Sequence, residues 1–218
     1  MKISASILNA DYARLGEDTL AAIQGGADEV HFDVMDNHFV PNLSVGPAVC
    51  DSLKQYLQQQ DDSTPIDVHL MTQPVDELID GFTKAGADRI SFHVPASNDV
   101  ERSLLRIKGH DCKAGLVLNP DEAIDVIEPW FGHIDRVLVM SVNPGFGGQG
   151  FIRDCTGKIT KLRQLIDSKK LAIEIAVDGG INQETIKLVA EAGADVCIVG
   201  SAIFGSDDYK KTIHQLKQ

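Results

Sequence analysis

The segment QETIKLVAEAGADVCIVGS, residues 183–201, contains the pattern that decides the fold. Its apolar spacing predicts a helix near Gln183–Ala192, Gly193 supplies a residue that can end this helix, and the apolar run Val196–Val199 predicts a strand. The same Gly-Ala-Asp triplet separates a helical from an apolar segment at residues 26–28 and 86–88. A helix that leads into a strand within a few residues is typical of parallel α/β folds.

Short apolar segments alternate with longer amphipathic segments outward from this unit, along the whole chain. We predict strands near Ile3–Leu8, Glu29–Val34, Ile66–His69, Arg89–His93, Ala114–Leu118, Arg136–Met140, Ile173–Val177 and Val196–Val199. We predict helices near Arg14–Gln24, Pro47–Gln58, Val75–Lys84, Val100–Ile107, Glu122–Ile127, Thr156–Asp167, Gln183–Ala192 and Asp208–Leu216. Eight such alternations predict one (β/α)8 TIM barrel of the α/β class over residues 1–218. A doubly wound open sheet is the alternative, but polar residues follow many of the strands rather than a single switch point.

The composition argues against several classes of partner. The chain has 32 acidic and 20 basic residues and a formal charge of −12, which disfavours nucleic acid and anionic membrane surfaces. No apolar run approaches the roughly 20 residues of a membrane span, and we see no N-terminal signal pattern. The four cysteines form no CxxC pair, so we expect no thiolate zinc site and a reducing, cytoplasmic location.

Four polar side chains stand where barrel enzymes carry their chemistry, at the carboxyl ends of strands. His31 and Asp33 are two residues apart and therefore face the same side of one strand, while His69 ends the next strand and Asp178 follows the seventh. A single histidine is more often a hydrogen-bonded core residue, and a single aspartate is more often a helix cap. Four such residues on three strands instead predict a site for one divalent metal ion per subunit: Zn, Fe, Co or Mn.

Other residues near these strand ends are expected to have supporting roles. Met35, Met71 and Met140 are expected to form an apolar wall beside the metal, although core packing is the default for methionine. We interpret His93 as a polar residue of the barrel mouth that binds no ion. Asp67 stands two residues before His69, and we expect it to support this histidine from behind.

Glycine-rich segments follow the sixth, seventh and eighth predicted strands. A single glycine pair is usually a tight turn, but three such loops together favour a phosphate site made of backbone amides, because no Lys or Arg stands in them. The residues expected to bind substrate there are Gly145, Phe146, Gly147, Gly148, Gly179, Gly180, Gly200 and Ser201. The loop after the sixth strand is long enough to act as a lid.

Six segments resemble one known family. They are SILNADYARLG (Ser6–Gly16), HFDVMDNHFVPNLSVGP (His31–Pro47), DVHLM (Asp67–Met71), MSVNPGFGGQ (Met140–Gln149), VDGGI (Val177–Ile181) and GSAIF (Gly200–Phe204). In this order they resemble ribulose-phosphate 3-epimerases over essentially the whole chain. The departures are Asn9 where the family often has serine, Ala5 where proline is common, and Val94-Pro95-Ala96 where a proline–glutamate order is more usual.

The resemblance implies a specific chemistry. It implies interconversion of D-ribulose 5-phosphate and D-xylulose 5-phosphate through an enediolate, in the pentose phosphate pathway. A metal would be held by His31, Asp33, His69 and Asp178, and the two aspartates would be the acid–base pair. Ser6, His69 and the three glycine loops would contact the phosphorylated ketose. The family also implies a homo-oligomer.

Three alternatives stay open at this point. A 3-epimerase of another ketose phosphate, such as D-allulose 6-phosphate, would share the same site. A metal-dependent aldolase or decarboxylase could use the same barrel and phosphate loops. A non-catalytic sugar-phosphate binder would need no acids on two faces of its ligand. The products formed from each sugar separate these alternatives.

Overall fold

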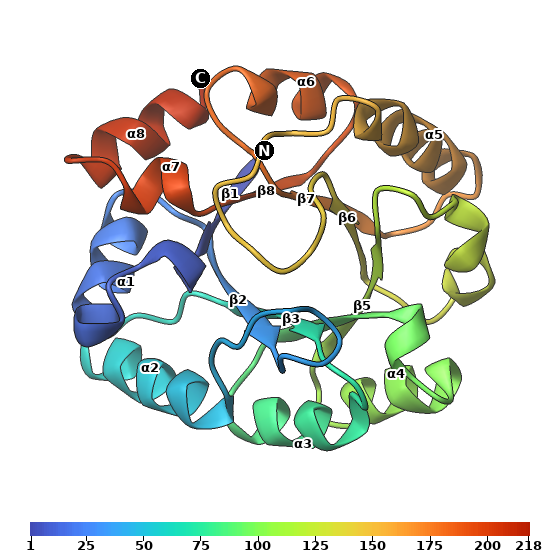
Figure 1. The fold of residues 1–218 in the computed structure, drawn as a ribbon, viewed down its shortest axis with the longest axis horizontal. Helices are drawn as coiled ribbons and strands as arrows, with labels where there is room; N and C mark the ends of the chain where they lie inside the picture. Colours follow the sequence, from blue (N-terminus) through green and yellow to red (C-terminus); the bar gives the residue numbers. More distant parts are fainter.

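The computed structural model describes all 218 residues, and its eight strands pair in sequence order to form a closed parallel barrel (Figure 1). The strands are β1 (Lys2–Ser6), β2 (Glu29–Met35), β3 (Ile66–Met71), β4 (Arg89–His93), β5 (Lys113–Leu118), β6 (Arg136–Met140), β7 (Glu174–Asp178) and β8 (Val196–Val199). The barrel closes where Lys2 of β1 pairs with Val196 of β8. The predicted (β/α)8 fold class is therefore confirmed, and the open-sheet alternative is excluded.

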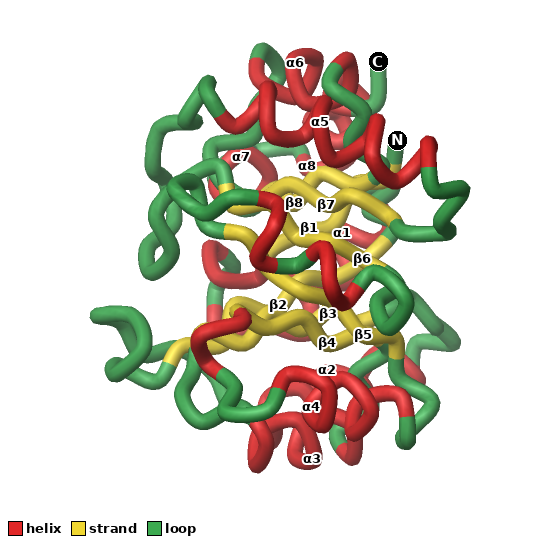
Figure 2. The backbone as a smooth tube through the Cα atoms, turned by 90° about the vertical axis from the view of Figure 1, so that its right-hand side faces the viewer, coloured by secondary structure: helices red, strands yellow, loops and turns green.

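Helices surround the barrel, as Figure 1 shows, and cover the strands on opposite sides in Figure 2. They are α1 (Leu15–Gln24), α2 (Pro47–Gln59), α3 (Asp76–Lys84), α4 (Val100–Lys108), α5 (Cys155–Ser168), α6 (Thr185–Glu191), α7 (Ser201–Phe204) and α8 (Tyr209–Leu216). Their buried faces pack on the outward side chains of the strands, such as Val30 and Phe32 of β2. None of these helices combines the length and hydropathy that a membrane crossing requires.

The sequence prediction differs from the structure most clearly in three segments, one of which is the short helix α7 (Ser201–Phe204), where no helix was expected. The helix expected over Glu122–Ile127 is wrong, because this part of the chain forms two short 3-10 helices, Ile124–Val126 and Glu128–Trp130. Pro129 lacks an N–H group and disfavours helical geometry at the residue before it, so a regular α-helix does not develop there. The first strand ends at Ser6 instead of Leu8, and a 3-10 turn over Ile7–Asn9 follows it.

The inward-facing side chains of β2, β3 and β4 differ in character from an apolar cluster on the other side of the barrel. Side chains at every second position of β2, β3 and β4 point inward and include histidines and carboxylates. Across the barrel, Val117, Leu138, Ala176 and Ile198 belong to a separate apolar cluster between the strands. The histidines and carboxylates of β2 and β3 thus face this apolar cluster inside the barrel.

Candidate active site

The four predicted metal ligands meet at one point near the carboxyl ends of the strands. One ligand atom from each of His31, Asp33, His69 and Asp178 lies within 4.8 Å of the others. Strand register brings them together, because Asp33 of β2 is paired with His69 of β3, and Asp178 ends β7. Two imidazoles and two carboxylates in such a cluster fit a divalent transition metal.

His31 is held so that one of its ring nitrogens faces this cluster. Its Nδ1 lies 3.0 Å from Oδ2 of Asp67, and its Nε2 is buried, without a hydrogen-bond partner, 3.5 Å from Oδ1 of Asp33. Burial lowers the pKa of His31, but the Asp33 and Asp67 carboxylates outweigh it and hold this pKa well above its usual value. An unpartnered buried nitrogen beside the Asp33 carboxylate is the environment in which a cation is expected.

The position of Asp67 corrects one expectation. We expected this carboxylate to support His69, its neighbour on the same strand. The β2–β3 register instead pairs Asp67 with His31, and the carboxylate contacts the histidine of the adjacent strand. Nδ1 of His69 lies 3.3 Å from Oδ1 of Asp33, and Nε2 lies 2.9 Å from Nε2 of His93. His93 was expected at the barrel mouth, but it is fully buried behind His69 and does not line the pocket.

The two aspartates of the cluster have opposite electrostatic environments. Burial raises the pKa of Asp33, but His31 and His69 outweigh it and hold this pKa far below its usual range. Burial, followed by the nearby Asp33 carboxylate, raises the pKa of Asp178 to about 7. Pairs of carboxyl groups whose pKa values are pushed apart in this way are typical of an acid and a base that work together. Ser6 donates a hydrogen bond of 2.7 Å to Oδ2 of Asp33 and orients it.

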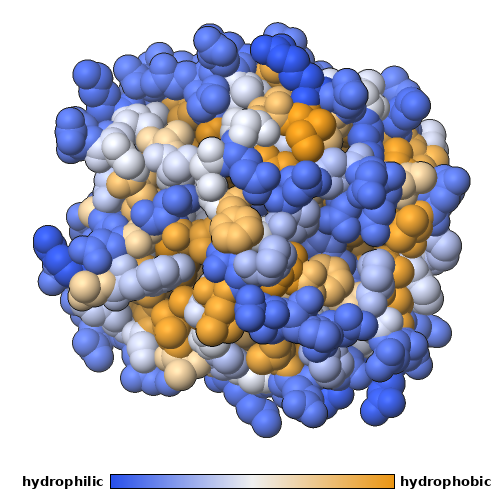
Figure 3. Space-filling view, viewed as in Figure 1, coloured by the Kyte–Doolittle hydropathy of each residue, from blue (hydrophilic) through white to orange (hydrophobic).

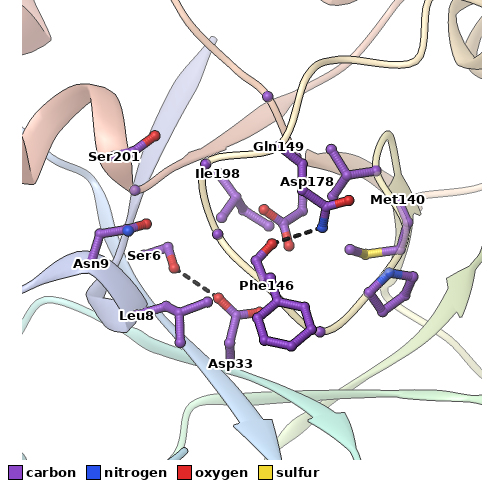
Figure 4. Close-up of a pocket in the computed structure, with 18 of the residues that line it drawn as sticks. Ser6, Leu8, Asn9, Asp33, Met140, Phe146, Gln149, Asp178, Ile198 and Ser201 are labelled. Carbon is purple, nitrogen blue, oxygen red and sulfur yellow. Dashed lines mark hydrogen bonds between the residues drawn. The ribbon is translucent and has the colours of Figure 1, made fainter. Parts of the chain in front are cut away.

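A pocket opens directly above the cluster, with Asp33 on one side and Asp178 on the other (Figure 4). The predicted substrate-binding and apolar-wall residues that line it are Ser6, Met35, Met71, Met140, Gly145, Phe146, Gly147, Gly148, Gly179, Gly180, Gly200 and Ser201. His69 does not line the pocket, so the structure places it in the cluster rather than against a ligand of the pocket. Leu8, Asn9, Gln149 and Ile198 also line the pocket and were not expected there.

Two glycines after β7 have conformations that other residues adopt with difficulty. Gly179 has φ +117° and Gly180 has φ +65°, and a Cβ atom on Gly180 would lie 2.5 Å from the backbone nitrogen of Phe151. Chain segments after β6 and β7 therefore approach each other closely at the pocket rim. Both glycines line the pocket, where the sequence pattern predicted a substrate-binding loop.

The loop after β6 lies across the barrel mouth, and side-chain hydrogen bonds hold its shape (Figure 1). Gln149 donates from Nε2 to the carbonyl oxygens of Asn143, at 2.7 Å, and of Phe146, at 2.8 Å. Asn42, from the loop after β2, donates to the carbonyl oxygen of Gly145 at 2.8 Å. Hydrophobic side chains gather around the centre of this face inside a hydrophilic rim (Figure 3), and Phe146 is 55% exposed.

Five charged residues form what we call the charged floor, beneath the metal cluster: Glu29, Asp67, Arg89, Arg136 and Glu174. The fully buried Arg136 lies 2.8 Å from Glu29, 2.8 Å from Glu174 and 3.1 Å from Asp67. Sequence reasoning missed this role for Arg136. Polar residues at every second position of β2 and β4 are the signal that could have revealed the floor, because barrel interiors usually contain branched apolar side chains.

Comparison with known proteins identifies the family. The family model described as the ribulose-phosphate 3 epimerase family matches residues 2–204. The chain belongs to this family. It is 52% identical over 209 residues to the ribulose-phosphate 3-epimerase of Serratia marcescens, with 96% of this chain and 98% of the relative covered. It is 50% identical over 215 residues to the ribulose-phosphate 3-epimerase of Escherichia coli strain K12, covering 99% of this chain and 94% of the relative.

These relatives are epimerases, and the chain is accordingly an isomerase, as the resemblance implied. The solved structure of KGPDC from Streptococcus mutans shares the barrel with a TM-score of 0.71 at 14% identity, covering 99% of this chain and 94% of that one. At this identity the likeness concerns the fold alone. The family and the high identity to its members thus define the reaction class, while the geometry of the site bears on how the reaction proceeds.

Proposed function

We propose that this member of the ribulose-phosphate 3-epimerase family interconverts D-ribulose 5-phosphate and D-xylulose 5-phosphate with Asp33 and Asp178 as base and acid. The observation that carries this proposal is the convergence of these two carboxyl groups on one pocket, from β2 and β7, with pKa values pushed in opposite directions. The names of relatives at 52% and 50% identity support the choice of substrate.

The difficult step is removal of the proton from carbon 3 of the sugar, next to a ketone. Asp33, held ionised by the imidazoles beside it, takes this proton, and the electron pair of the C–H bond becomes part of a planar enediolate. Asp178, which keeps its proton near neutral pH, returns a proton to carbon 3 from the opposite face. One proton is removed and one is returned in each turnover, so the reaction consumes no net proton. In the reverse direction the two residues exchange roles.

A divalent cation fits the same cluster. His31, Asp33, His69 and Asp178 would hold it, and the unpartnered Nε2 of His31 supports this assignment. Such an ion, Zn, Fe, Co or Mn, would stabilise negative charge on the oxygens of the enediolate as a Lewis acid. Ser6 keeps Asp33 oriented through its hydroxyl hydrogen bond.

The glycine loops would bind the phosphate of the sugar. Glycines from the loops after β6, β7 and β8 line the pocket, and no lysine or arginine does. Neutral backbone amides can bind an anion in such a concave loop arrangement. The net charge of −12 does not attract an anionic substrate from a distance, so the phosphate must be bound by these local contacts. Met35, Met71 and Met140 would exclude water from the face of the planar intermediate.

The test is incubation of the purified chain with D-ribulose 5-phosphate in heavy water, followed by NMR. We expect D-xylulose 5-phosphate with one deuterium at carbon 3. A binding protein would leave the sugar unchanged, and an aldolase or decarboxylase would release products of carbon–carbon cleavage. Specificity constants for D-ribulose 5-phosphate and D-allulose 6-phosphate separate the two epimerase alternatives, and a higher constant for the hexulose would overturn the choice of substrate.

Three broader expectations remain part of the proposal. Residues 1–218 would act as one catalytic domain, copies of the chain would assemble into a homo-oligomer, and the enzyme would work in the cytoplasm. Sedimentation of the purified chain at several concentrations tests the second of these expectations, since a monomer would contradict it.

A further inference from the structure

His93 of β4 contacts the back of one candidate metal ligand. Its Nε2 lies 2.9 Å from Nε2 of His69, and the two rings meet through these nitrogens, with centroids 5.0 Å apart and planes tilted by 32°. Both side chains are completely buried. His93 does not line the pocket and is not one of the four clustered groups, so the proposed function leaves it without a role.

The distance between the two Nε2 atoms requires one shared hydrogen. Two ring nitrogens 2.9 Å apart form a hydrogen bond only if one carries a proton and the other presents its lone pair. A neutral imidazole with its proton on one nitrogen has a lone pair on the other. The direction of this hydrogen bond therefore decides whether Nδ1 of His69 carries a proton.

Nδ1 of His69 is the nitrogen that faces the cluster, 3.3 Å from Oδ1 of Asp33. It can bind a cation only through its lone pair, which requires the ring proton to be on Nε2. We propose that His93 is a positioning residue that accepts the hydrogen bond from Nε2–H of His69 and thereby leaves Nδ1 of His69 free to bind the metal. This role rests on the proposed function, because it presumes a cation among the four clustered residues.

The surroundings of His93 suit an acceptor that does not move. Phe39, from the loop after β2, packs on its ring with centroids 5.1 Å apart. His93 makes no ion pair, and its Nδ1 is buried without a partner, so no carboxylate competes for the orientation of the ring. The remaining proton of the neutral His93 ring would lie on this Nδ1.

The two candidate ligand histidines are then oriented from different sides. Asp67 contacts Nδ1 of His31, which leaves Nε2 of His31 facing the cluster. His93 contacts Nε2 of His69, which leaves Nδ1 facing it. One ligand is supported by a carboxylate and the other by a neutral imidazole, although metal-bound histidines are supported by carboxylates, carbonyl groups or water in most sites.

A measurement on the unaltered protein tests the role directly. Histidine labelled with ¹⁵N, with the protein loaded with zinc, gives separate side-chain nitrogen signals in long-range ¹H–¹⁵N NMR spectra. We expect the ring proton of His69 on Nε2 and a metal-bound signal for its Nδ1. A proton on Nδ1 of His69 in the zinc-loaded protein would overturn the proposal, and no substitution is needed for this result.

Substitutions give a second test, with zinc affinity measured by competition with a chelator. His93→Leu removes the acceptor, and we expect it to weaken zinc binding by about 10-fold to 100-fold. His93→Gln can still accept through its amide oxygen and should stay within a few-fold of the unaltered chain. His214→Leu is the matched control, because it removes an exposed imidazole that lies outside both the pocket and the four clustered residues.

The possible outcomes are distinguishable. Zinc binding by His93→Leu as tight as that of His93→Gln would overturn the role of His93 and leave the metal site intact. Failure of the unaltered chain to bind zinc would reject the metal centre itself, and the role of His93 with it. Circular dichroism and the thermal midpoint of the metal-free variants separate loss of affinity from loss of folding.

Discussion

Oδ2 of Asp67 lies 3.0 Å from Nδ1 of His31 and joins the candidate metal cluster to the charged floor beneath it. The same carboxylate oxygen lies 3.1 Å from the guanidinium of Arg136. Burial raises the pKa of Asp67, but Arg136 and His31 outweigh it, so the pKa lies well below its usual range and the group is ionised. The orientation of His31 thus depends on a chain of buried charges that begins at the opposite end of the barrel.

Removal of the central cation of this floor should be costly. Arg136→Met leaves Glu29, Asp67 and Glu174 without their main partner, and we expect a loss of about 3–5 kcal/mol in the free energy of unfolding. Urea denaturation monitored by circular dichroism measures it. Arg14→Met is the control, because Arg14 is exposed and pairs only with Glu17, and it should change stability little. Equal stability of Arg136→Met and the unaltered chain would contradict the structural role of the floor.

The acid–base pair predicts an asymmetric exchange pattern. Asp33→Asn and Asp178→Asn should each lower turnover by about 100-fold to 10,000-fold. The remaining carboxyl group can still remove a proton from its own face and return it. Each variant should therefore exchange solvent deuterium into carbon 3 of only one of the two epimers, as followed by NMR, and the two variants should differ in which one.

The control for this experiment is Asp207→Asn, an exposed aspartate outside the pocket. It should epimerise at the unaltered rate. Near-normal epimerisation by Asp33→Asn or Asp178→Asn would remove the two-carboxyl scheme. Exchange into both epimers by a single variant would indicate that one residue serves both faces.

Much of the architecture could be predicted from local patterns. The Gly-Ala-Asp triplets and apolar runs located the strands, because the outward face of every barrel strand must be buried under helices. The positions of His31 and Asp33 followed from the two-residue period of a strand. Both conclusions need only neighbouring residues in one segment of the chain.

Contacts between strands could not be predicted in the same way. Asp67 contacts His31 rather than His69, because the β2–β3 register pairs Asp67 with His31. Register depends on both strands and cannot be read from one segment alone. The 2.9 Å contact between His69 and His93 depends on the same kind of relationship between β3 and β4. Arg136 begins β6 and resembles a surface residue in the sequence, and only barrel closure places it among three carboxylates.

The close approach at Gly180 predicts a defect in substrate binding. In Gly180→Ala the new Cβ would meet the backbone of Phe151, which cannot rotate away as a side chain can, and φ +65° is unfavourable for alanine. The loop must shift, and we expect KM for D-ribulose 5-phosphate to rise on the order of tenfold or more. Gly132→Ala, where nothing lies within 4 Å of the new Cβ, should leave KM unchanged. Steady-state kinetics of both variants decide the matter, and an unchanged KM in Gly180→Ala would argue against a binding role for this loop.

Metal removal should abolish turnover reversibly. Dialysis against a chelator would take the ion from the four clustered ligands, and addition of Zn, Fe, Co or Mn should restore activity. In Asp178→Asn, by contrast, added metal should restore little, because the acid–base group is absent. Full activity in protein shown to be metal-free by elemental analysis would reject the metal assignment.

The charged floor also predicts how stability depends on pH. Burial raises the pKa of Glu174, but hydrogen bonds from Lys2 and Arg136 and the charge of Arg89 outweigh it and lower this pKa from 4.5 to about 2. A depressed pKa in the folded state means that the stabilisation is present above pH 4.5 and is lost as the pH falls toward about 2.

Glu174→Gln, which has no charge to lose, should show a weaker fall in unfolding free energy over this range than the unaltered chain, as measured by urea denaturation at each pH. The exposed Glu184→Gln should behave like the unaltered chain. An equal fall in unfolding free energy for Glu174→Gln and the unaltered chain would contradict this role. It would mean that the charge of Glu174 contributes nothing to stability through Lys2, Arg136 and Arg89, and that other carboxylates cause the acid sensitivity.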